Sequence, residues 1–315
     1  MAMGTDAPVI EAVLDGTGVP HERQAMLGPL TWYGLGGAAA ILAHPRNVGE
    51  VQTIVRRCCA TGAPLYVLGK GANLLVADQG VQGVVMTLDS EELRDYRIDG
   101  ASGRIIAGGG ADLEKVITAS VRQGLAGLEG LAGIPATIGG AIRMNAGGAF
   151  GQIGDWVRSV SVVTETGELA TMDRTQLQFD YRRSNLGANI LVRAEFQLKI
   201  SDDPAATRAK LKEVMAYKKN SQPMAAHSAG CAYKNPSREI SVKGAGQLID
   251  EAGLKGLRVG GAEVSPRHGN FIVAHEQAKA ADVLAVMRQV ERTVAERFGV
   301  KLEREVVVWG EESGE

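Results

Sequence analysis

The pattern of hydrophobic and polar positions changes its period several times along the chain, which predicts a mixed α+β fold. The clearest helix covers residues 47–61, because apolar side chains recur on one face and Gly62 can end the helix. Asn47 and Glu50 have the spacing of a capping box at its start. Cys58 falls on the apolar face, so we interpret it as a small core residue. The same period predicts further helices: one begins at Asp112, and others cover residues 9–14, 204–219 and 279–298. The last of these should bury Val283, Val286, Val290 and Val294, and Gly299 can end it.

Strand patterns fill much of the chain between these helices. Residues 64–88 read as a strand, a glycine turn and a second strand. Residues 157–173 alternate in the manner of a hairpin around a turn at 165–167. Thr31 and Trp32 are also expected in a strand, just before a glycine turn. The sequence therefore predicts at least two strand-rich regions separated by helices.

Two glycine patterns could be mistaken for nucleotide-binding fingerprints. RIIAGGGADLEKV, residues 104–116, joins a strand to a helix through three glycines. A Rossmann fingerprint also needs an acid about 20 residues further on, at the end of a second strand. Glu129 has that distance but lies among glycines, so we expect no Rossmann domain. Gly69-Lys70-Gly71 is not a P-loop either, because no Gly-Lys-Ser/Thr closes the pattern.

The stretch GLAGLEGLAGIPATIGGAIRMNAGGAFG, residues 124–151, is dense in glycine but otherwise mostly apolar. A flexible linker would be polar, and a helix would lose roughly 1 kcal/mol for each Gly relative to Ala. We therefore expect irregular backbone that is buried and held close to a ligand. Gly139-Gly140-Ala141 offers consecutive N–H groups of the kind that bind phosphate, and Asn145 adds a polar side chain. A structural turn is the alternative, but a turn needs far fewer residues.

Composition narrows the class of protein. The chain has 315 residues, enough for two or three domains, and its 45% hydrophobic and 22% charged residues are typical of a globular protein. A net charge of −2 does not indicate nucleic-acid binding. No apolar run is long enough to span a bilayer, and the first residues lack the pattern of a secretory signal. Three cysteines make no disulfide framework, which favours a cytoplasmic location, and no metal-binding spacing is present.

The segment GLEGLAGIPATIGGAIRMNAGG closely resembles the flavin-binding segment of the UDP-N-acetylenolpyruvoylglucosamine reductase (MurB) family, and the resemblance covers nearly the whole chain. It implies non-covalent FAD, because Ala38 follows Gly37 where related oxidases often carry a flavin-linked His. The turn GKGANLLV resembles the family's G-x-G-S-N-L-L-V turn, with Ala72 in place of Ser. The resemblance implies the following FAD-binding residues: Gly69, Lys70, Gly71, Ala72, Asn73, Leu74, Gly133, Ile134, Pro135, Thr137, Gly139, Gly140, Ala141 and Asn145.

Three further segments resemble catalytic motifs of this family. YRRS contains Arg182, which the resemblance implies would stabilise the substrate carboxylate and the developing enolate charge. SAGCAYKNP has Cys231 where most members have a catalytic Ser, and Cys231 would protonate the substrate α-carbon. LEREV contains Glu305, which would help to polarise the intermediate. Val307 and Ala274 depart from the family pattern, where Arg and Asn are usual. The resemblance also implies three substrate contacts: Tyr181, Lys219 and Asn235.

The implied reaction reduces the enolpyruvyl ether of UDP-N-acetylglucosamine to UDP-N-acetylmuramate, with hydride passing from NADPH through FAD. The implied fold is α+β, with a two-part FAD-binding domain of the vanillyl-alcohol-oxidase (PCMH) type over residues 1–90 and 91–220. A smaller α+β substrate-binding domain is expected over residues 221–300, and a tail, 301–315, returns to the flavin. The spacing of the motifs resembles the subgroup that lacks an inserted substrate-covering loop. The expected partner is the nucleotide-sugar substrate, with no nucleic acid or membrane.

Two other functions stay open at this point. One is an FAD oxidase of the same fold that acts on an alcohol or sugar, which Ala38 and the SAGCAYKNP and LEREV segments oppose. The other is a non-catalytic flavin-binding protein, which has no use for Arg182, Cys231 and Glu305 together. By itself a Cys between Gly and Ala is more often structural, but the polar neighbours of Cys231 favour a working thiol. NADPH and NADH stay open as hydride donors.

Overall fold

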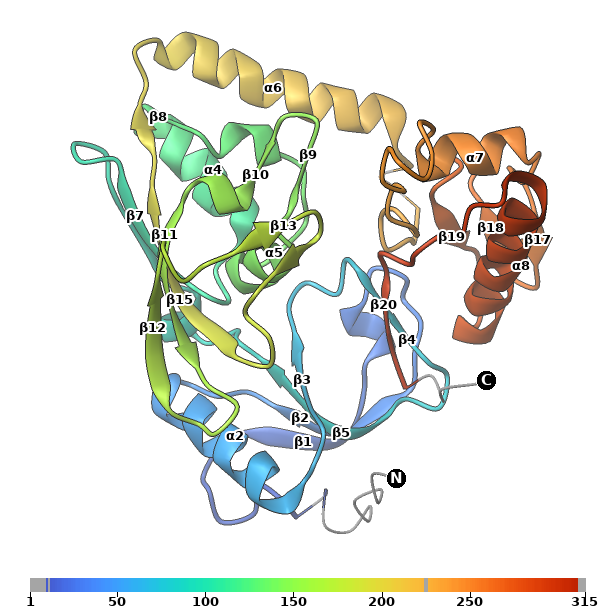
Figure 1. The fold of residues 1–315 in the computed structure, drawn as a ribbon. Coiled ribbons are helices and arrows are strands. Elements are labelled where there is room, and N and C mark those ends of the chain that lie inside the picture. The colour runs from blue at the N-terminus through green and yellow to red at the C-terminus, as the bar shows by residue number, and fades with distance from the viewer. Residues whose placement is uncertain (1–9, 11, 224–225, 311–315) are drawn as a thin grey trace. The chain divides into compact units, whose positions relative to one another are not determined.

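The computed structural model describes residues 10, 12–223 and 226–310, which form two compact units (Figure 1). Unit 1 comprises the described parts of residues 1–25, 39–70 and 82–217. Unit 2 comprises the described parts of residues 26–38, 71–81 and 218–315. Helix α6 (Pro204–Ser221) starts in unit 1 and ends in unit 2, at nearly the bounds predicted from the sequence. Each unit is therefore built from three segments that are far apart in the sequence.

The first sheet of unit 1 has the strand order β1-β2-β5-β3, with β3 parallel to β5. Its strands are β1 (His21–Met26), β2 (Ala38–Ala43), β5 (Val81–Thr87) and β3 (Leu65–Leu68). Helix α2 (Val48–Thr61) packs its apolar face against β2 and β5 in one core. Cys58 is part of that core and 3% exposed, so the predicted helix and the predicted burial of Cys58 are both confirmed.

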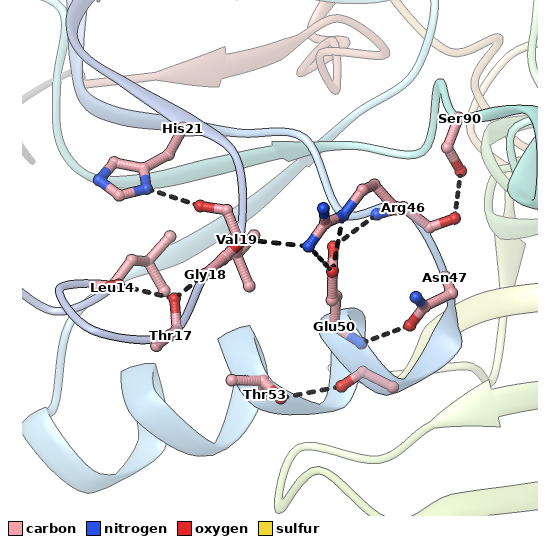
Figure 2. Close-up of polar contacts among 11 residues, drawn as sticks. Leu14, Thr17, Gly18, Val19, His21, Arg46, Asn47, Glu50, Thr53 and Ser90 are labelled. Carbon is pink, nitrogen blue, oxygen red and sulfur yellow. Dashed lines mark hydrogen bonds and ion pairs between the residues drawn. The ribbon is translucent and has the colours of Figure 1, made fainter.

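The start of α2 is fixed by the polar side chains drawn in Figure 2. Asn47 accepts a hydrogen bond from the Glu50 amide at 3.0 Å, which confirms the predicted N-cap. Arg46 donates to the Glu50 carboxylate from Nε at 2.8 Å, and this hydrogen bond lowers the pKa of Glu50. Arg46 also donates to the Gly18 carbonyl oxygen at 3.0 Å, and its own carbonyl oxygen accepts from the Ser90 hydroxyl. The helix start is thus tied to the loop before β1 and to the start of α3 (Glu91–Arg94).

The second sheet of unit 1 is antiparallel throughout and has the order β12-β11-β15-β7-β6. Its strands are β12 (Leu169–Asp173), β11 (Val157–Val163), β15 (Ile190–Gln197), β7 (Arg104–Gly108) and β6 (Tyr96–Asp99). Strands β11 and β12 form the predicted hairpin. Strand β7 leads into α4 (Leu113–Arg122), which Asp112 caps as expected. A Rossmann fingerprint lies between parallel strands, whereas β7 pairs with β15 and β6 antiparallel, so the junction of β7 with α4 is not such a fingerprint.

Helix α5 (Ile138–Arg143) lies inside the glycine-rich stretch, where we expected irregular backbone. That expectation was wrong for these residues. Thr137 caps the helix, and such a cap contributes about 1 kcal/mol. Two buried isoleucines add roughly 1.5–3 kcal/mol each. Gly139 packs so closely that a Cβ would lie 3.0 Å from the Gly109 carbonyl oxygen, which only a glycine allows without a shift. These gains outweigh the helical cost of roughly 1 kcal/mol for each glycine.

Short pairings surround α5 in unit 1. Their strands are β8 (Leu125–Ala126) with β16 (Lys199–Ile200), β9 (Gly147–Gly148) with β10 (Gly151–Gln152), and β13 (Phe179–Asp180) with β14 (Arg183–Ser184). Two 3₁₀ turns, η2 (Glu129–Leu131) and η3 (Ile153–Asp155), lie between them in the sequence. The glycine-rich stretch is therefore a chain of short ordered pieces that share one core with the second sheet.

Unit 2 is a small α+β body. Its antiparallel sheet has the order β17-β18-β19, from Arg258–Val259, Ala262–Val264 and Ile272–Ala274. Helices α7 (Ala245–Glu251) and α8 (Ala280–Phe298) pack in its core, and the four valines predicted to face inward on α8 are buried. Strand β20 (Val307–Trp309) pairs in parallel with β4 (Leu74–Val76). Gly299 ends α8 in the left-handed conformation, as predicted.

Two local expectations have a different outcome. Thr31 and Trp32 are not in a strand: they follow the 3₁₀ turn η1 (Gly28–Leu30), and the Thr31 hydroxyl closes the turn by donating to Gly28 and Leu35 carbonyl oxygens. The helix expected over residues 9–14 includes residues 9 and 11, which lie outside the described residues; residues 12–16 form turns. No described helix has the length and hydropathy to cross a membrane.

Candidate active site

Two glycine loops that are far apart in the sequence meet in unit 1 at the side chain of Thr137. A Cβ on Gly69 would lie 2.9 Å from Thr137 Oγ1, and a Cβ on Gly140 would lie 3.3 Å from the same oxygen. Gly140 is exposed, and residues 133–137 and Gly139 are half-buried although most of them are apolar. The backbone of Gly69 and Gly140 and the hydroxyl of Thr137 therefore form one surface, which we call the Thr137 cradle. A side chain at either glycine would fill this space. This is the surface expected for close contact with a cofactor.

The amides of α5 are used differently from the expectation of free N–H groups. Ile138 donates to the Ala111 carbonyl oxygen at 2.9 Å, and Gly139 donates to the Gly109 carbonyl oxygen at 2.7 Å. The Gly140 amide reaches the Thr137 hydroxyl at 3.2 Å. Consecutive free amides at 139–141 are therefore not present, because each amide already has an acceptor in the chain. A cofactor would meet these residues through close approach of bare backbone.

Lys70, from the first glycine loop, forms an ion pair with Asp112 at 2.6 Å. Burial by itself would raise the pKa of Asp112, but the hydrogen bond and charge of Lys70, with the amides of Lys115 and Glu114, outweigh it and lower the pKa. Asp112 also forms a bridge with Thr137. Lys70 is thus fixed at the start of α4, beside the residue that caps α5.

The second part of the loop, Gly71–Leu74, belongs to unit 2. Gly71 has φ 62, and a Cβ there would lie 2.3 Å from the Leu30 carbonyl oxygen, so this glycine is required by backbone packing. Ala72 follows it without a side-chain donor, and Asn73 donates from Nδ2 to the Glu305 carbonyl oxygen at 3.0 Å. The sequence reasoning placed Asn73 at the cofactor, and the structure also connects it to a predicted catalytic residue.

Arg182 lies in the two-residue turn between β13 and β14, next to Tyr181. Its φ is 57, a left-handed conformation that is uncommon for residues other than glycine. Its guanidinium donates from Nη1 to the Gly147 carbonyl oxygen at 2.9 Å and lies 5.1 Å from the centre of the Tyr181 ring. A strained backbone of this kind is often found at functional sites. Tyr181 is exposed.

Asn145 follows α5 and has φ 42. It is 1% exposed, and its side chain is used within unit 1. Nδ2 donates to Gln152 Oε1 at 2.9 Å and to the Asp180 carbonyl oxygen at 3.0 Å, while Oδ1 accepts from the Gly154 amide at 3.1 Å. Both amide hydrogens are thereby donated within unit 1, so the side chain has no further donor to offer a cofactor.

Cys231 and Glu305 lie on neighbouring segments of unit 2. Cys231 forms an antiparallel bridge with Phe271, and the Glu305 amide donates to the Ala232 carbonyl oxygen at 2.8 Å. Tyr233 continues the pairing with Arg304. Backbone hydrogen bonds therefore bring together the segments that carry the predicted proton donor and the predicted carboxylate. Cys231 is half-buried.

The two other predicted substrate residues of unit 2 have separate partners. The Lys219 carbonyl oxygen accepts from Arg267 Nη2 at 2.7 Å. Asn235 Oδ1 accepts from the Ala245 amide at 3.0 Å, which satisfies the first turn of α7. The side chain of Asn235 therefore orders the start of a helix as well as lying near the Cys231 segment in sequence.

Sequence reasoning missed two residues that hold the Cys231 and Glu305 segments. Asn270 is buried and brackets the Tyr233 backbone, accepting from its amide at 2.9 Å and donating to its carbonyl oxygen at 2.8 Å. Arg304 binds the Glu291 carboxylate at 2.6 and 3.2 Å. Asn270 is the last polar residue before the apolar run FIVA, but it follows Ser265, Arg267 and His268, so the sequence does not distinguish it. No local pattern indicates the Arg304–Glu291 pair, because the two residues are 13 positions apart and lie in different elements.

Among the described residues, no group of His, Cys, Asp and Glu could hold a metal ion. The residues predicted for the site carry hydroxyl, amide, guanidinium, carboxylate and thiol groups. These suit binding of a nucleotide cofactor, charge stabilisation and proton transfer.

Comparison with known proteins agrees with this arrangement. Residues 39–173 match the family model "FAD binding domain", and residues 222–309 match "UDP-N-acetylenolpyruvoylglucosamine reductase, C-terminal domain". The UDP-N-acetylenolpyruvoylglucosamine reductase of Heliobacterium modesticaldum is 40% identical, covering 93% of this chain and 92% of its own. That of Listeria monocytogenes is 36% identical, covering 94% and 98%.

A solved structure gives the same result. The crystal structure of UDP-N-acetylenolpyruvylglucosamine reductase (MurB) from Thermus caldophilus has a TM-score of 0.77 and 39% identity, covering 92% of this chain and 98% of its own. The expected α+β fold with an FAD-binding domain is confirmed. The chain belongs to the UDP-N-acetylenolpyruvoylglucosamine reductase family.

Proposed function

We propose that the protein reduces the enolpyruvyl ether of UDP-N-acetylglucosamine to UDP-N-acetylmuramate, in the synthesis of peptidoglycan precursors. NADPH is the hydride donor and FAD is bound without a covalent link. The relatives that match most of the chain carry the name of this reductase. The partner is the nucleotide sugar, with no nucleic acid or membrane, and the location is cytoplasmic.

The cradle around Thr137 fits FAD on physical grounds, because Gly69 and Gly140 leave bare backbone where any side chain would contact the hydroxyl. We assign to FAD the two glycine loops, residues 69–74 and 133–141, together with the backbone of Asn145. When bound, FAD supplies hydride transfer between NADPH and the substrate carbon. In this proposal residues 1–90 and 91–220 bind FAD, residues 221–300 bind the substrate, and the tail 301–315 returns to the flavin.

Arg182 is assigned to charge stabilisation. A guanidinium held in one orientation can stabilise negative charge as it develops on the substrate carboxylate and enolate. The hydrogen bond to the Gly147 carbonyl oxygen and the left-handed turn restrict the orientation of this side chain. Tyr181, beside it, is assigned to substrate contact, together with Lys219 and Asn235.

Cys231 is assigned as the proton donor to the α-carbon, and Glu305 as the carboxylate that assists polarisation of the enolpyruvyl group. The observation that carries this assignment is the backbone hydrogen bond from Glu305 to Ala232, the residue after Cys231. It fixes the two segments beside each other within one unit. Proton delivery and carboxylate assistance at one substrate carbon need such neighbours.

An anaerobic stopped-flow experiment tests the function. NADPH should bleach the flavin absorbance of the holoprotein, and the enolpyruvyl nucleotide should then restore it while UDP-N-acetylmuramate forms. Protein without flavin after reconstitution, or flavin that NADPH reduces but the enolpyruvyl nucleotide cannot reoxidise, would contradict the proposal. A sugar or alcohol that reduces the flavin directly would favour an oxidase instead.

A further inference from the structure

The Arg182 turn has two supports, and the side chain of buried Asn145 contacts both of them. On one side, Asp180 ends β13 immediately before the turn. On the other side, the Arg182 guanidinium donates a hydrogen bond to the carbonyl oxygen of Gly147, the first residue of β9. Gly147 is paired with Gln152 across the β9–β10 hairpin. The position of the guanidinium therefore depends on both β13 and the β9–β10 hairpin.

Asn145 contacts both of these supports. Its Nδ2 donates to the Asp180 carbonyl oxygen at 3.0 Å and to Gln152 Oε1 at 2.9 Å. Its Oδ1 accepts from the Gly154 amide at 3.1 Å, in the turn that follows β10. The Asn145 side chain therefore connects Asp180, the residue before the turn, with strand β10. Strand β10 in turn pairs with Gly147, whose carbonyl oxygen accepts the hydrogen bond from Arg182.

The orientation of the Asn145 amide follows from its neighbours. Gln152 Nε2 donates to Asp155 Oδ1 at 2.9 Å, so Gln152 presents its oxygen to Asn145. The Asp180 carbonyl can only accept. Asn145 must therefore point its NH₂ group at two acceptors and its oxygen at the Gly154 amide. An aspartate has the same shape but would place an oxygen against both acceptors.

The backbone of Asn145 also supports this role. Its φ of 42 is a conformation that Asn tolerates better than most residues, and it turns the chain sharply after α5. The amide of Asn145 donates to the Ile142 carbonyl oxygen at 3.1 Å, which ties the residue to the last turn of α5. Helix α5 is the element whose first residues form the Thr137 cradle. Asn145 thus lies between the proposed flavin surface and the Arg182 turn.

We propose that Asn145 is a positioning residue for Arg182: its buried amide fixes the β13–β14 turn against the β9–β10 hairpin and so sets the direction of the guanidinium. This inference rests on the proposed function, in which Arg182 stabilises charge on the substrate. Asn145 acts through Arg182, because both hydrogens of its side-chain amide are donated to the supports of that turn.

The test combines Asn145→Asp, Arg182→Met and the double variant in the holoprotein. Asn145→Asp should lower kcat for reduction of the enolpyruvyl nucleotide at least 10-fold, with KM for NADPH and the rate of flavin reduction by NADPH changed less than 2-fold. In the Arg182→Met background the same substitution should change kcat less than 2-fold, because there is no guanidinium left to direct. Multiplying effects in the double variant, or equal slowing of flavin reduction, would overturn the proposal.

Asn185→Asp is the matched control. Asn185 makes the same kind of amide contacts at the base of the same hairpin, to Gln178 and Gln176, but it is exposed and does not contact the supports of Arg182. Its kcat should stay within 2-fold of the wild type. A loss at Asn185 equal to that at Asn145 would show that any disturbance of the hairpin suffices, which contradicts a specific role for Asn145.

Hydrogen–deuterium exchange separates this inference from the proposed function. Peptides covering residues 179–184 should exchange faster in Asn145→Asp and unchanged in Asn185→Asp. Asn145→Ser removes the same hydrogen bonds without adding a charge, and it replaces the Asp variant if that variant does not fold. Failure of the wild type to reduce the enolpyruvyl nucleotide would remove the proposed function and leave the exchange result intact. Unchanged exchange over 179–184 in both Asn145 variants would refute the positioning role.

Discussion

The Arg182 turn of unit 1 and the Cys231 and Glu305 segments of unit 2 hold their functional residues in different ways. Arg182 sits in a left-handed turn, and its side chain donates to a carbonyl oxygen of a neighbouring hairpin. Cys231 and Glu305 are held by backbone hydrogen bonds and bridges, which do not depend on the identity of either side chain. If both residues act as proposed, we expect that another proton donor can replace Cys231, whereas Arg182 needs its own geometry.

The largest expected effect comes from removing the guanidinium. Arg182→Met should slow flavin reoxidation by the enolpyruvyl nucleotide by about 10²–10³-fold, as when one electrostatic partner of a transition state is lost. NADPH should still reduce the flavin at the wild-type rate. Arg182→Lys should be nearly as slow, because an ammonium cannot reproduce the planar fork. Stopped-flow absorbance measures both half-reactions. A Lys variant with a rate close to the wild type would show that position 182 does not need the guanidinium geometry.

The second effect concerns Glu305. Glu305→Gln keeps the backbone hydrogen bond to Ala232 and the contact of its carbonyl oxygen with Asn73, and changes only the carboxylate. We expect reoxidation to slow by about 10²-fold through loss of this charge. The variant should still unfold in one cooperative transition, since the backbone pairing remains. Differential scanning calorimetry and stopped-flow together check this, and a wild-type reoxidation rate would remove Glu305 from the mechanism.

Substitutions of Cys231 test whether backbone pairing alone is enough to hold a proton donor at this position. Because backbone pairing holds its segment, Cys231→Ser should keep measurable activity, while Cys231→Ala should lose roughly 10²-fold in the step that protonates the substrate. Flavin reduction by NADPH should continue in both variants. Wild-type reoxidation in the Ala variant would make Cys231 a structural residue.

The other thiols provide an internal reference for labelling of Cys231. Burial raises the pKa of the Cys58 thiol to about 12, so Cys58 should resist iodoacetamide at pH 8, whereas exposed Cys59 should react. The enolpyruvyl nucleotide should protect Cys231 alone. Peptide mass spectrometry measures all three, and rapid alkylation of Cys58 in folded protein would contradict its place in the core.

A smaller effect is expected at the Thr137 cradle. Gly69→Ala places a methyl group 2.9 Å from the Thr137 hydroxyl, so that hydroxyl must shift and weaken the cap of α5. We expect FAD affinity to fall about 10-fold, equivalent to about 1.4 kcal/mol. Gly148→Ala is the control, because nothing lies within 4 Å of its added Cβ. Fluorescence titration of the apoprotein with FAD measures both, and equal affinities would place FAD away from Gly69.

The smallest effect is expected for the Lys70–Asp112 pair. Asp112→Asn keeps a good N-cap but removes the charge, and it should cost at most about 1 kcal/mol at pH 7 because the pair is partly exposed. The pKa of Asp112 is lowered in the folded state, so its contribution is present above the ordinary pKa and is lost as pH falls through the folded pKa. Urea unfolding of wild type and variant should therefore converge in strong acid. A difference that persists there would mean that the charge is not its cause.

Sequence reasoning succeeded where the cause of a structure is local. The period and caps of residues 47–61 predicted α2, and the valine spacing with Gly299 predicted α8. It failed at α5, because close packing of Gly139 on Gly109 is a tertiary property that composition does not show. Thr31 failed for a related reason, since its hydroxyl closes a turn that strand propensity ignores.

The residues of the candidate site show the same contrast between local patterns and long-range contacts. Motifs predicted Arg182, Cys231 and Glu305 as candidates, because each is surrounded by a recognisable run of residues. The hydrogen bonds of Asn145, Asn270 and Arg304 could not be anticipated in the same way. Their partners come from segments that only the folded chain brings together. Side chains that support a site are therefore harder to predict than those that perform the chemistry.

The parallel pairing of β20 with β4 has a consequence for synthesis on the ribosome. Unit 2 needs strand β20, residues 307–309, to cover β4, residues 74–76, and Trp309 also accepts a hydrogen bond from Ala77. All described segments of unit 1 are translated before the main part of unit 2. The Asn73 side chain and β4 therefore meet these partners only after more than two hundred further residues have been translated, because Asn73 binds the carbonyl oxygen of Glu305. The β20–β4 pairing and the segment that carries Glu305 are therefore the last parts of unit 2 to be completed during synthesis.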